Sequence, residues 1–302
     1  MIRKKKTFFT TKAPSSPRKP FFGKAQKQNI KTVSPISPEA FWKGLKAKSF
    51  GQSFYSFSEV TSTNDTASEL IVKGAPEGTL VTAEAQTKGR GRQERVWTTS
   101  MGKALAFSLI LKPKMDIRQV PGLTLAAVVA VAQTLEGYGL KPQIKWPNDL
   151  LLKGKKVCGI LTEMGPKYDN RLSVILGIGI NLNEVTKDFP LAIRSLATSA
   201  YRASGRRVDR IEFLQKLMFR LETVYGWMNT KKFSRVLSEW RKRSVTLGQF
   251  VRVTEGNRNF EGQVVDVDLN GFLLVRREKG KTETVLSGDI EILKSKVKKR
   301  PS

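Results

Sequence analysis

Histidine is absent from this 302-residue sequence, and cysteine occurs only once. Without an imidazole the chain cannot build a Ser-His-Asp triad, a Cys-His pair or a His-ligated zinc site. Acid–base chemistry must therefore come from carboxylates, lysines or the substrate. The lone Cys158 cannot form an intramolecular disulfide, so a reducing, cytoplasmic location is expected. Long apolar runs are also missing: Leu123 to Leu135 is too short to cross a bilayer and predicts a buried helix, so no membrane association is expected.

Acidic residues are missing from residues 1–38, which hold ten Lys or Arg and several prolines. This composition predicts a disordered basic arm over residues 1–50, and both a plain tail and a transit peptide are open interpretations. Residues 294–302 form a second basic tail. Residues 39–293 hold 39 Lys or Arg against 26 Asp or Glu. This moderate excess favours a phosphate-bearing ligand, nucleic acid or an acidic protein partner.

Apolar periodicity divides the rest of the chain into two domains, over residues 51–243 and 244–293. In the first, helical spacing covers residues 63–73, 123–136 and 210–227, and a further short helix ends near residue 240. Strand-like segments lie between them at residues 54–60, 79–85, 104–111, 143–146, 155–163 and 172–178. The second domain consists of short alternating runs joined by Glu255-Gly256 and Asn270-Gly271, and Asn-Gly between apolar runs is a strong hairpin signal. The predicted fold class is α+β, with a mixed sheet flanked by helices followed by a small β-barrel.

The most informative segment covers residues 86–97. Gly89 and Gly91 allow the backbone to approach a ligand closely and to adopt positive φ. Arg90 and Arg92 alternate with these glycines and carry guanidinium groups suited to phosphate. Taken alone, a solvated basic hairpin tip explains the pattern equally well.

Three other segments carry polar side chains at predicted turns. Ser62-Thr63-Asn64 stands at a helix start, where N-capping is the ordinary explanation. Lys145-Trp146-Pro147-Asn148-Asp149 sets a cation, an amide and a carboxylate on a Pro-fixed turn, although a solvated corner explains it as well. Residues 177–183 leave a strand through two glycines and offer Asn181 as a hydrogen-bonding side chain, which also suits an ordinary loop.

A lysine on an apolar strand forms the last candidate. Strand alternation predicts that Lys156, Cys158 and Ile160 share one face, so that Lys156 points into a pocket lined by apolar residues. A lysine in such a place usually serves an anion. Cys158 is interpreted mainly as a small buried strand residue.

Taken together, in this order and spacing, these segments resemble the motifs of the biotin protein ligase family. The resemblance covers about Ser53 to Leu293. It implies a class II synthetase-like catalytic domain with a C-terminal SH3-like barrel. It also implies an enzyme that activates biotin with ATP and Mg²⁺ to biotinyl-5′-AMP and transfers biotin to one lysine of a biotin carboxyl carrier domain.

The same resemblance implies roles for individual residues. Biotin is expected to contact Ser62, Thr63, Asn64, Gln86, Gly89, Arg90, Gly91, Arg92, Lys156 and Gly159. ATP and the adenylate are expected to contact Arg92, Arg95, Trp97, Lys145, Asn148, Lys156 and Asn181. The expected catalytic residues are Arg92, Arg95, Asp149 and Lys156. No metal-binding motif is present, so Mg²⁺ is expected to bind mainly through the phosphates, with Asp149 as a further candidate ligand or as the group that orients the incoming amine.

Two segments depart from the family pattern. The family loop often continues with Arg-Gly where this chain has Gln93-Glu94, which puts the retention of the adenylate in question. Residues 1–50 show no apolar helical periodicity from which to build the winged helix of bifunctional members. The chain is therefore expected to be a monofunctional ligase without specific DNA binding. The oligomeric state, including a homodimer, and the identity of the carrier are left open.

Two alternatives remain. An enzyme of the same fold that handles lipoate or octanoate can pair a lysine with a cysteine, and Cys158 stands close to Lys156 in the sequence. A basic nucleic-acid-binding module would explain the charged tails. It would also need aromatic side chains interleaved with basic ones, and the arm offers only Phe8, Phe9, Phe21 and Phe22.

Overall fold

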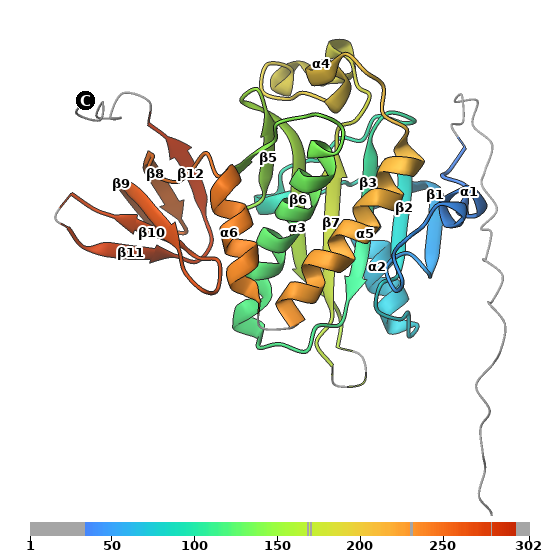
Figure 1. The fold of residues 1–302 in the computed structure, drawn as a ribbon, viewed down its shortest axis with the longest axis horizontal. Coiled ribbons are helices and arrows are strands. Elements are labelled where there is room, and N and C mark those ends of the chain that lie inside the picture. The colour runs from blue at the N-terminus through green and yellow to red at the C-terminus, as the bar shows by residue number, and fades with distance from the viewer. Residues whose placement is uncertain (1–33, 168, 170, 230–231, 279, 294–302) are drawn as a thin grey trace, which may run out of the picture. The chain divides into compact units, whose positions relative to one another are not determined.

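A seven-stranded mixed sheet forms the centre of the larger domain (Figure 1). The computed structural model describes residues 34–167, 169, 171–229, 232–278 and 280–293. The strands are β1 (Phe54–Val60), β2 (Leu80–Gln86), β3 (Leu105–Leu111), β4 (Gln143–Lys145), β5 (Asp149–Leu152), β6 (Lys155–Met164) and β7 (Val174–Ile180). Their order is β1-β2-β3-β7-β6-β5-β4, in which β1 and β2 are parallel and the other neighbours are antiparallel.

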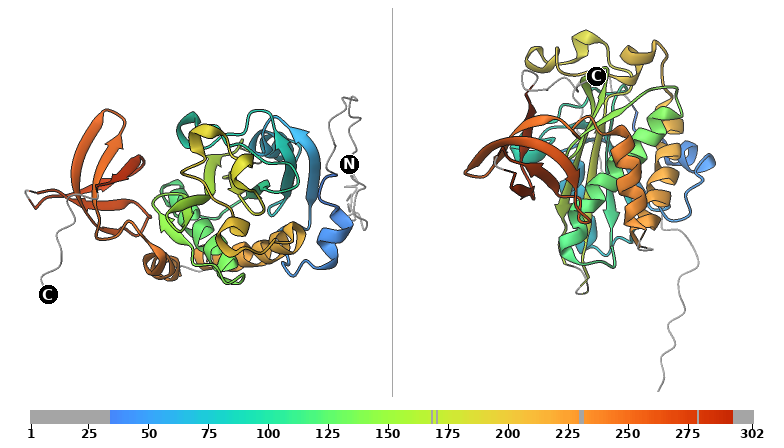
Figure 2. Two further views of the ribbon diagram at one scale, coloured as in Figure 1. Left: turned by 90° about the horizontal axis from the view of Figure 1, so that it is seen from above. Right: turned by 60° about the vertical axis from the view of Figure 1, so that its left-hand side comes forward.

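Helices cover both faces of this sheet. They are α1 (Pro38–Lys43), α2 (Thr63–Val72), α3 (Val120–Glu136), α4 (Ala200–Ser204), α5 (Arg210–Asn229) and α6 (Phe233–Arg243), with short 3-10 turns at Arg92–Glu94, Ile117–Gln119, Thr186–Asp188 and Leu191–Ile193. Figure 2 shows α3, α5 and α6 on one side of the sheet. On the other side, Ala67 and Ile71 of α2 pack with Val81, Ile110 and Ile175. No helix in the described ranges is long and apolar enough to span a membrane.

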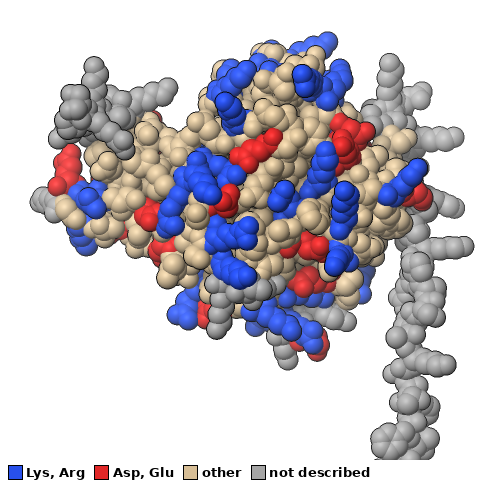
Figure 3. Space-filling view, in the orientation of Figure 1, with Lys and Arg blue, Asp and Glu red and all other residues tan. Residues whose placement is uncertain are grey.

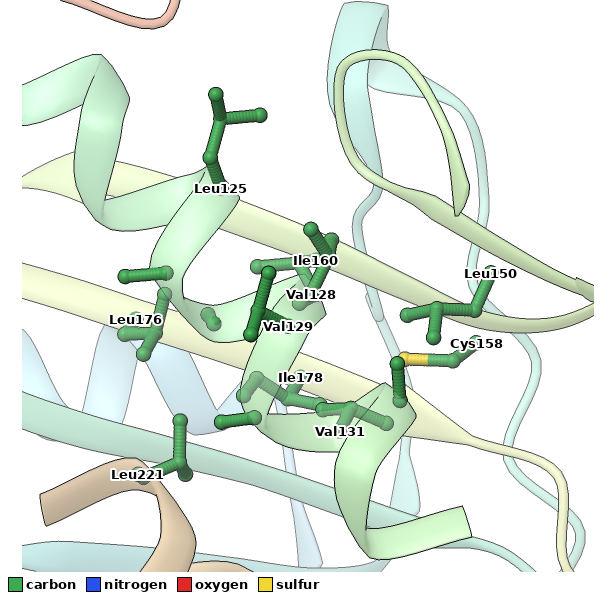
Figure 4. Packing of buried hydrophobic residues seen from close by; sticks show 14 of the residues in the cluster. Leu125, Val128, Val129, Val131, Leu150, Cys158, Ile160, Leu176, Ile178 and Leu221 are labelled. Carbon is green, nitrogen blue, oxygen red and sulfur yellow. The ribbon is translucent and has the colours of Figure 1, made fainter. Parts of the chain in front are cut away.

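Helix α3 is the centre of the main hydrophobic core. Its sequence is apolar on all sides because the sheet lies on one side and α5 and α6 on the other. In Figure 4, Val128 and Val131 of α3 pack near Ile160 of β6 and Ile178 of β7. Burial of each such side chain contributes roughly 1.5–3 kcal/mol. This packing buries one face of β6 and β7, and the opposite face of these two strands forms part of the site described below.

The smaller domain is a five-stranded antiparallel sheet of order β11-β10-β9-β8-β12. Its strands are β8 (Phe250–Glu255), β9 (Arg258–Val267), β10 (Leu273–Arg276), β11 (Thr282–Val285) and β12 (Asp289–Ile292). The predicted Asn-Gly turn connects β9 and β10, and Gly271 adopts φ of 88° there, which favours glycine. The Gly271 carbonyl accepts a hydrogen bond from Trp146 Nε1 at 3.1 Å and so joins the two domains. The α+β fold class is confirmed.

The prediction of disorder up to residue 50 is wrong for residues 34–50, while residues 1–33 lie outside the described residues. Ser37 caps α1, Pro38 occupies its first turn, and Phe41 and Phe50 are buried. The Glu222 carboxylate accepts the backbone N–H groups of residues 48, 49 and 50. A six-residue helix is too short to show apolar periodicity, and prolines that serve as helix starts looked like signs of disorder.

Two strands were not predicted. Asp149 begins β5 although the sequence favoured a turn there, and β12 follows Gly288 without any alternating run long enough to indicate it. Both strands are only four residues long, so pairing with β6 and β8, and not local propensity, decides their structure.

Candidate functional site

A pocket of about 310 Å³ lies where the sheet face opposite α3 meets the smaller domain. Its lining comes from the start of α2, the loop after β2, strands β3 to β7, and strands β8 and β12. Every predicted site residue lines this pocket except Gly89 and Asn181. Segments separated by more than a hundred positions in the sequence therefore converge on one cavity.

Glycines form the floor of the pocket on β6 and β7. A Cβ atom at Gly177 would strike the Asn64 side chain, and one at Gly179 would strike the Trp97 ring. A Cβ atom at Gly159 would lie 3.1 Å from Lys156 Cε. Gly177 and Gly179 leave room for the Asn64 and Trp97 side chains above the strands, and Gly159 does so less strictly because the lysine chain can shift. The floor leads from the polar residues of α2 to the Trp97 and Lys156 side chains.

A buried polar cluster forms one end of the pocket. Ser62 caps α2 through a hydrogen bond from the Asn64 N–H, so the ordinary capping explanation is correct for Ser62. The Thr63 N–H and hydroxyl both donate to Gln86 Oε1, at 2.9 and 3.2 Å. The single hydroxyl proton of Ser108 is shared between the Thr63 and Asn64 side-chain oxygens. The cluster presents fixed donors and acceptors to any ligand that enters this end.

The loop after β2 folds back on itself over the pocket. The Gly91 N–H bonds to the Arg95 carbonyl at 2.6 Å, and the Trp97 N–H bonds to the Gly89 carbonyl at 2.9 Å. Positive φ was predicted for the two glycines, but it occurs instead at Gln93 (53°) and Glu94 (57°). Left-handed backbone costs a residue with a side chain roughly 1–2 kcal/mol. The dipeptide that departs from the family pattern therefore carries the strained turn.

Each of the three loop arginines, Arg90, Arg92 and Arg95, is held by a different set of partners. Arg90 pairs with Asp65 through both carboxylate oxygens, at 3.0 and 2.7 Å. Arg92 donates to Asn148 Oδ1 at 3.5 Å and to the Gly288 carbonyl at 3.2 Å, and its burial lowers the pKa of its guanidinium.

Arg95 pairs with Asp289 of β12, and its guanidinium also donates to Gln93 Oε1 at 3.3 Å. The smaller domain thus contacts the loop at Gly288 and Asp289.

Lys156 faces Asp149 and Trp97 across the floor. Its Nζ lies 2.7 Å from Asp149 Oδ1 and 5.9 Å from the centroid of the Trp97 ring. A ligand with a carboxylate or phosphate at this position would meet a cation that is partly exposed and already oriented. Hydrogen bonds from a lysine ammonium to a carboxylate or phosphate are charge-assisted and about twice as strong as those between neutral groups.

The prediction that Lys156, Cys158 and Ile160 share a face is wrong. Leu150 pairs with Cys158 and Leu151 with Lys156, so Val157 is an extra residue in a β-bulge that rotates Lys156 to the pocket side. Cys158 and Ile160 instead pack beneath α3 (Figure 4). Burial raises the pKa of the Cys158 thiol, so this thiol is neither accessible nor ionised.

Three predicted residues serve mainly as supports. Asn148 donates to the Ile160 carbonyl at 2.7 Å while its oxygen accepts from Arg92. Asn181 lies beyond the end of β7 and donates to the Thr198 carbonyl at 3.0 Å, away from the pocket. The segment held by Asn181 pairs with the backbone of Lys156. Gly89 lies behind the pocket wall because the Trp97 carbonyl covers it.

The smaller domain contributes residues that sequence reasoning missed. Arg252 and Thr254 of β8 and Asp289, Ile290 and Glu291 of β12 line the pocket. They belong to no motif, and single positions of two short strands carry no signal that would distinguish them. Within the described part of the chain, no group of three or more metal-ligating side chains could hold a metal ion.

Two protein-family profiles match this sequence. The Biotin/lipoate A/B protein ligase family matches residues 56–181, and the Biotin protein ligase C terminal domain matches residues 246–293. The two matches correspond to most of the sheet domain and to the five-stranded domain.

Full-length comparisons agree with these profiles. The bifunctional ligase/repressor BirA of Bacillus spizizenii is 40% identical over 264 residues, which cover 87% of this chain and 81% of that protein. A ligase of Mycobacterium tuberculosis for biotin and acetyl-CoA-carboxylase is 29% identical over 242 residues, covering 76% of this chain and 86% of that protein. The structure of biotin protein ligase from Aquifex aeolicus in complex with biotin and ATP matches with a TM-score of 0.69 and 31% identity, covering 80% and 99% of the two chains.

Proposed function

This chain belongs to the biotin protein ligase family, and we propose how its pocket performs the two half-reactions of such a ligase. The enzyme joins biotin to the adenylyl group of ATP, releases pyrophosphate, and transfers biotin to a lysine of a biotin carboxyl carrier domain. One observation supports the assignment of the pocket most strongly. The glycine floor connects the Thr63–Gln86 cluster to Lys156. The Thr63–Gln86 end suits a polar ring, and the Lys156 end suits a carboxylate and a phosphate.

The ureido group of biotin binds at the polar end. Thr63 and Gln86 are already paired there, and Asn64 adds a buried amide. The ring system and the acyl tail of biotin then lie along the glycine floor, where Phe107 supplies a buried aromatic wall. Apolar walls with a few fixed polar groups are typical of small-molecule sites. The biotin carboxylate is thereby directed toward Lys156.

The first half-reaction is a displacement at the α-phosphorus of ATP. An oxygen of the biotin carboxylate forms the new P–O bond, and pyrophosphate leaves with the electron pair of the broken bond. This step needs alignment and neutralised charge more than it needs a base, which suits a chain without histidine. Lys156 bonds the carboxylate and the phosphate, and Arg92 and Arg95 bind phosphate oxygens. Lys145, Asn148 and Trp97 form the nucleotide side of the pocket.

Magnesium fits this pocket through the nucleotide. Asp149 is the carboxylate nearest Lys156, but the described residues supply no cluster of ligands around it, so phosphate oxygens would provide most of the coordination. When bound, the ion neutralises charge on the phosphates. Asp149 and Lys156 position the reacting groups whether or not Asp149 is a ligand of the ion.

In the second half-reaction the acceptor lysine attacks the acyl carbon of the adenylate, and AMP leaves. The amine must first lose a proton, and Asp149 is the carboxylate that can accept it at the Lys156 end of the pocket. The buried, neutral Cys158 takes no part, which removes the reason for a lipoate-handling alternative that pairs a lysine with a cysteine.

We propose that this chain acts as a ligase without specific DNA binding. Residues 34–50 are packed into the sheet domain, and residues 1–33 carry no apolar helical pattern for a winged helix. A variant that lacks residues 1–33 is expected to keep its biotin-dependent ATP turnover. Loss of turnover in a folded variant would contradict the assignment of the active site to the described domains.

Transfer to a carrier tests the complete function. The protein is incubated with ATP, Mg²⁺, biotin and a biotin carboxyl carrier domain, and the carrier is weighed by mass spectrometry. One added biotinyl group is expected, and none on a carrier whose acceptor lysine is replaced by arginine. Absence of labelling on the normal carrier, despite adenylate formation, would refute the second half-reaction.

A further inference from the structure

Arg90 lines the pocket and is held by two carboxylates that do not line it. Asp65, in the first turn of α2, accepts both terminal nitrogens of Arg90, at 3.0 and 2.7 Å. Glu163 of β6 lies 3.5 Å from the same guanidinium. Neither carboxylate belongs to the pocket lining, whereas Arg90 does. The pair therefore connects the loop to the scaffold and leaves the ligand space free.

Glu163 links this ion pair to the polar end of the pocket. Its Oε2 accepts the Asn64 amide at 2.5 Å, and the Asn64 oxygen accepts from Ser108. The same Ser108 proton is shared with the Thr63 hydroxyl, which donates to Gln86. A continuous chain of hydrogen bonds therefore connects the loop arginine with the side chains that bind the ureido group in the function proposed above.

The rest of the loop needs such a restraint. Its tip contains two residues with side chains in left-handed backbone, Gln93 and Glu94, and this strain favours opening of the loop. A bidentate pair between Arg90 and Asp65 resists opening with defined geometry. Asp65 also gains from its place at a helix N-terminus, where a negative charge is favoured.

We propose that Asp65, supported by Glu163, is a positioning residue that holds the loop of residues 89–97 closed over bound biotin by clamping Arg90. Asp65 acts through Arg90 and touches no reacting atom. Its loss should therefore weaken the retention of biotin and of the adenylate and leave the rate of the chemical step intact. This inference rests on the biotin-binding function proposed for the pocket.

Steady-state kinetics of pyrophosphate release test the clamp. Asp65→Asn is expected to raise the KM for biotin about two- to fivefold, the effect of a partly exposed ion pair, with kcat unchanged. The KM of the wild-type protein should rise with salt, because exposed charges are screened, and the KM of the variant should rise less, because the variant no longer contains the Arg90–Asp65 ion pair. Arg90→Gln should give a similar increase, and the double variant should be no worse than either single variant.

Asp266→Asn is the matched control. It breaks another bidentate pair, with Arg241, whose side chains are 39% and 40% exposed against 37% and 40% for the Arg90–Asp65 pair. Asp266 does not line the pocket, so its loss should leave the biotin KM and its salt dependence unchanged. An unchanged KM in Asp65→Asn, or the same increase in Asp266→Asn, would overturn the proposal.

Hydrogen exchange separates failure of the clamp from failure of the proposed function. Amides of residues 89–97 should exchange faster in Asp65→Asn than in the wild-type protein or in Asp266→Asn. If the wild-type protein released no pyrophosphate, the proposed function would fail, and the exchange rates would still decide for or against the clamp. Equal exchange in all three proteins would overturn it.

Discussion

Replacement of Lys156 by alanine should remove most of the rate of adenylate formation. Its Nζ lies 2.7 Å from Asp149, and both groups are partly screened from solvent beside the glycine floor. The neighbouring loop arginines are anchored on the side of the smaller domain, Arg92 by Gly288 and Arg95 by Asp289, so neither is placed to take over the contacts of Lys156. Loss of one preorganised donor to developing negative charge costs about 3 kcal/mol, or about 10²–10³ in kcat.

Pyrophosphate release at saturating biotin and ATP measures this loss. Lys155→Ala is the matched control, because Lys155 is adjacent in β6 and does not line the pocket, and its rate should stay near that of the wild-type protein. The double variant Lys156→Ala/Asp149→Asn removes the carboxylate that the single change leaves unpaired. Recovery of the rate in the double variant, or a rate of Lys156→Ala within threefold of wild type, would refute the reasoning.

Two further changes test other parts of the pocket, and a third tests a buried carboxyl group that does not line it. Arg92→Gly frees the loop from Asn148 and Gly288, so the adenylate should escape and label lysines of other proteins in the mixture. Labelling limited to the carrier would count against this explanation. Gly179→Ala places a methyl group where the Trp97 ring lies, at a packing cost of about 1–3 kcal/mol. The affinity for ATP should therefore fall about tenfold or more. Unchanged affinity would show that the ring is not fixed in this position. Burial raises the pKa of Glu184 to about 7, so between about pH 4.5 and pH 7 the folded state retains a proton that the unfolded state loses. The free energy of unfolding, measured with urea, should therefore decrease as the pH rises through this range. Glu184→Gln should flatten this decrease by up to about 3 kcal/mol, and parallel curves for the two proteins would contradict the assignment.

Much of the sheet domain could be predicted because its long elements carry strong periodic patterns. The strand at Phe54–Val60 matches its prediction, and the apolar segment around Leu123 is indeed a buried helix. The short elements could not be predicted, since α1, β5 and β12 depend on partners distant in the sequence. Local sequence patterns do not encode those pairings.

The order of the motifs was sufficient to identify most residues of the pocket, but it did not predict the direction in which their side chains point. A single bulge at Val157 moved Lys156 away from the face of Cys158, and strict alternation cannot foresee an extra residue. The strained φ at Gln93 occurs where glycine is the usual choice, so the sequence suggested the wrong residues for it. The acidic partners of the loop arginines, Asp65 and Asp289, also come from outside the motifs.

Figure 3 shows Lys and Arg gathered over the end of the molecule that carries α4. Arg206 and Arg207, which follow α4 in the chain, are exposed, and Arg207 lies over the Tyr201 ring with its guanidinium carbon 5.3 Å from the centroid. The basic excess of the chain thus belongs to its folded surface as well as to its terminal segments.

The central claim is that this pocket forms biotinyl-5′-AMP. The most direct test is to incubate the protein with ATP, Mg²⁺ and either biotin or lipoate, and to identify the acyl-adenylate by mass spectrometry. The glycine floor, the Thr63–Gln86 pair and Lys156 predict biotinyl-5′-AMP with biotin and no adenylate with lipoate. Formation of lipoyl-AMP in place of biotinyl-5′-AMP, or of neither, would contradict the account.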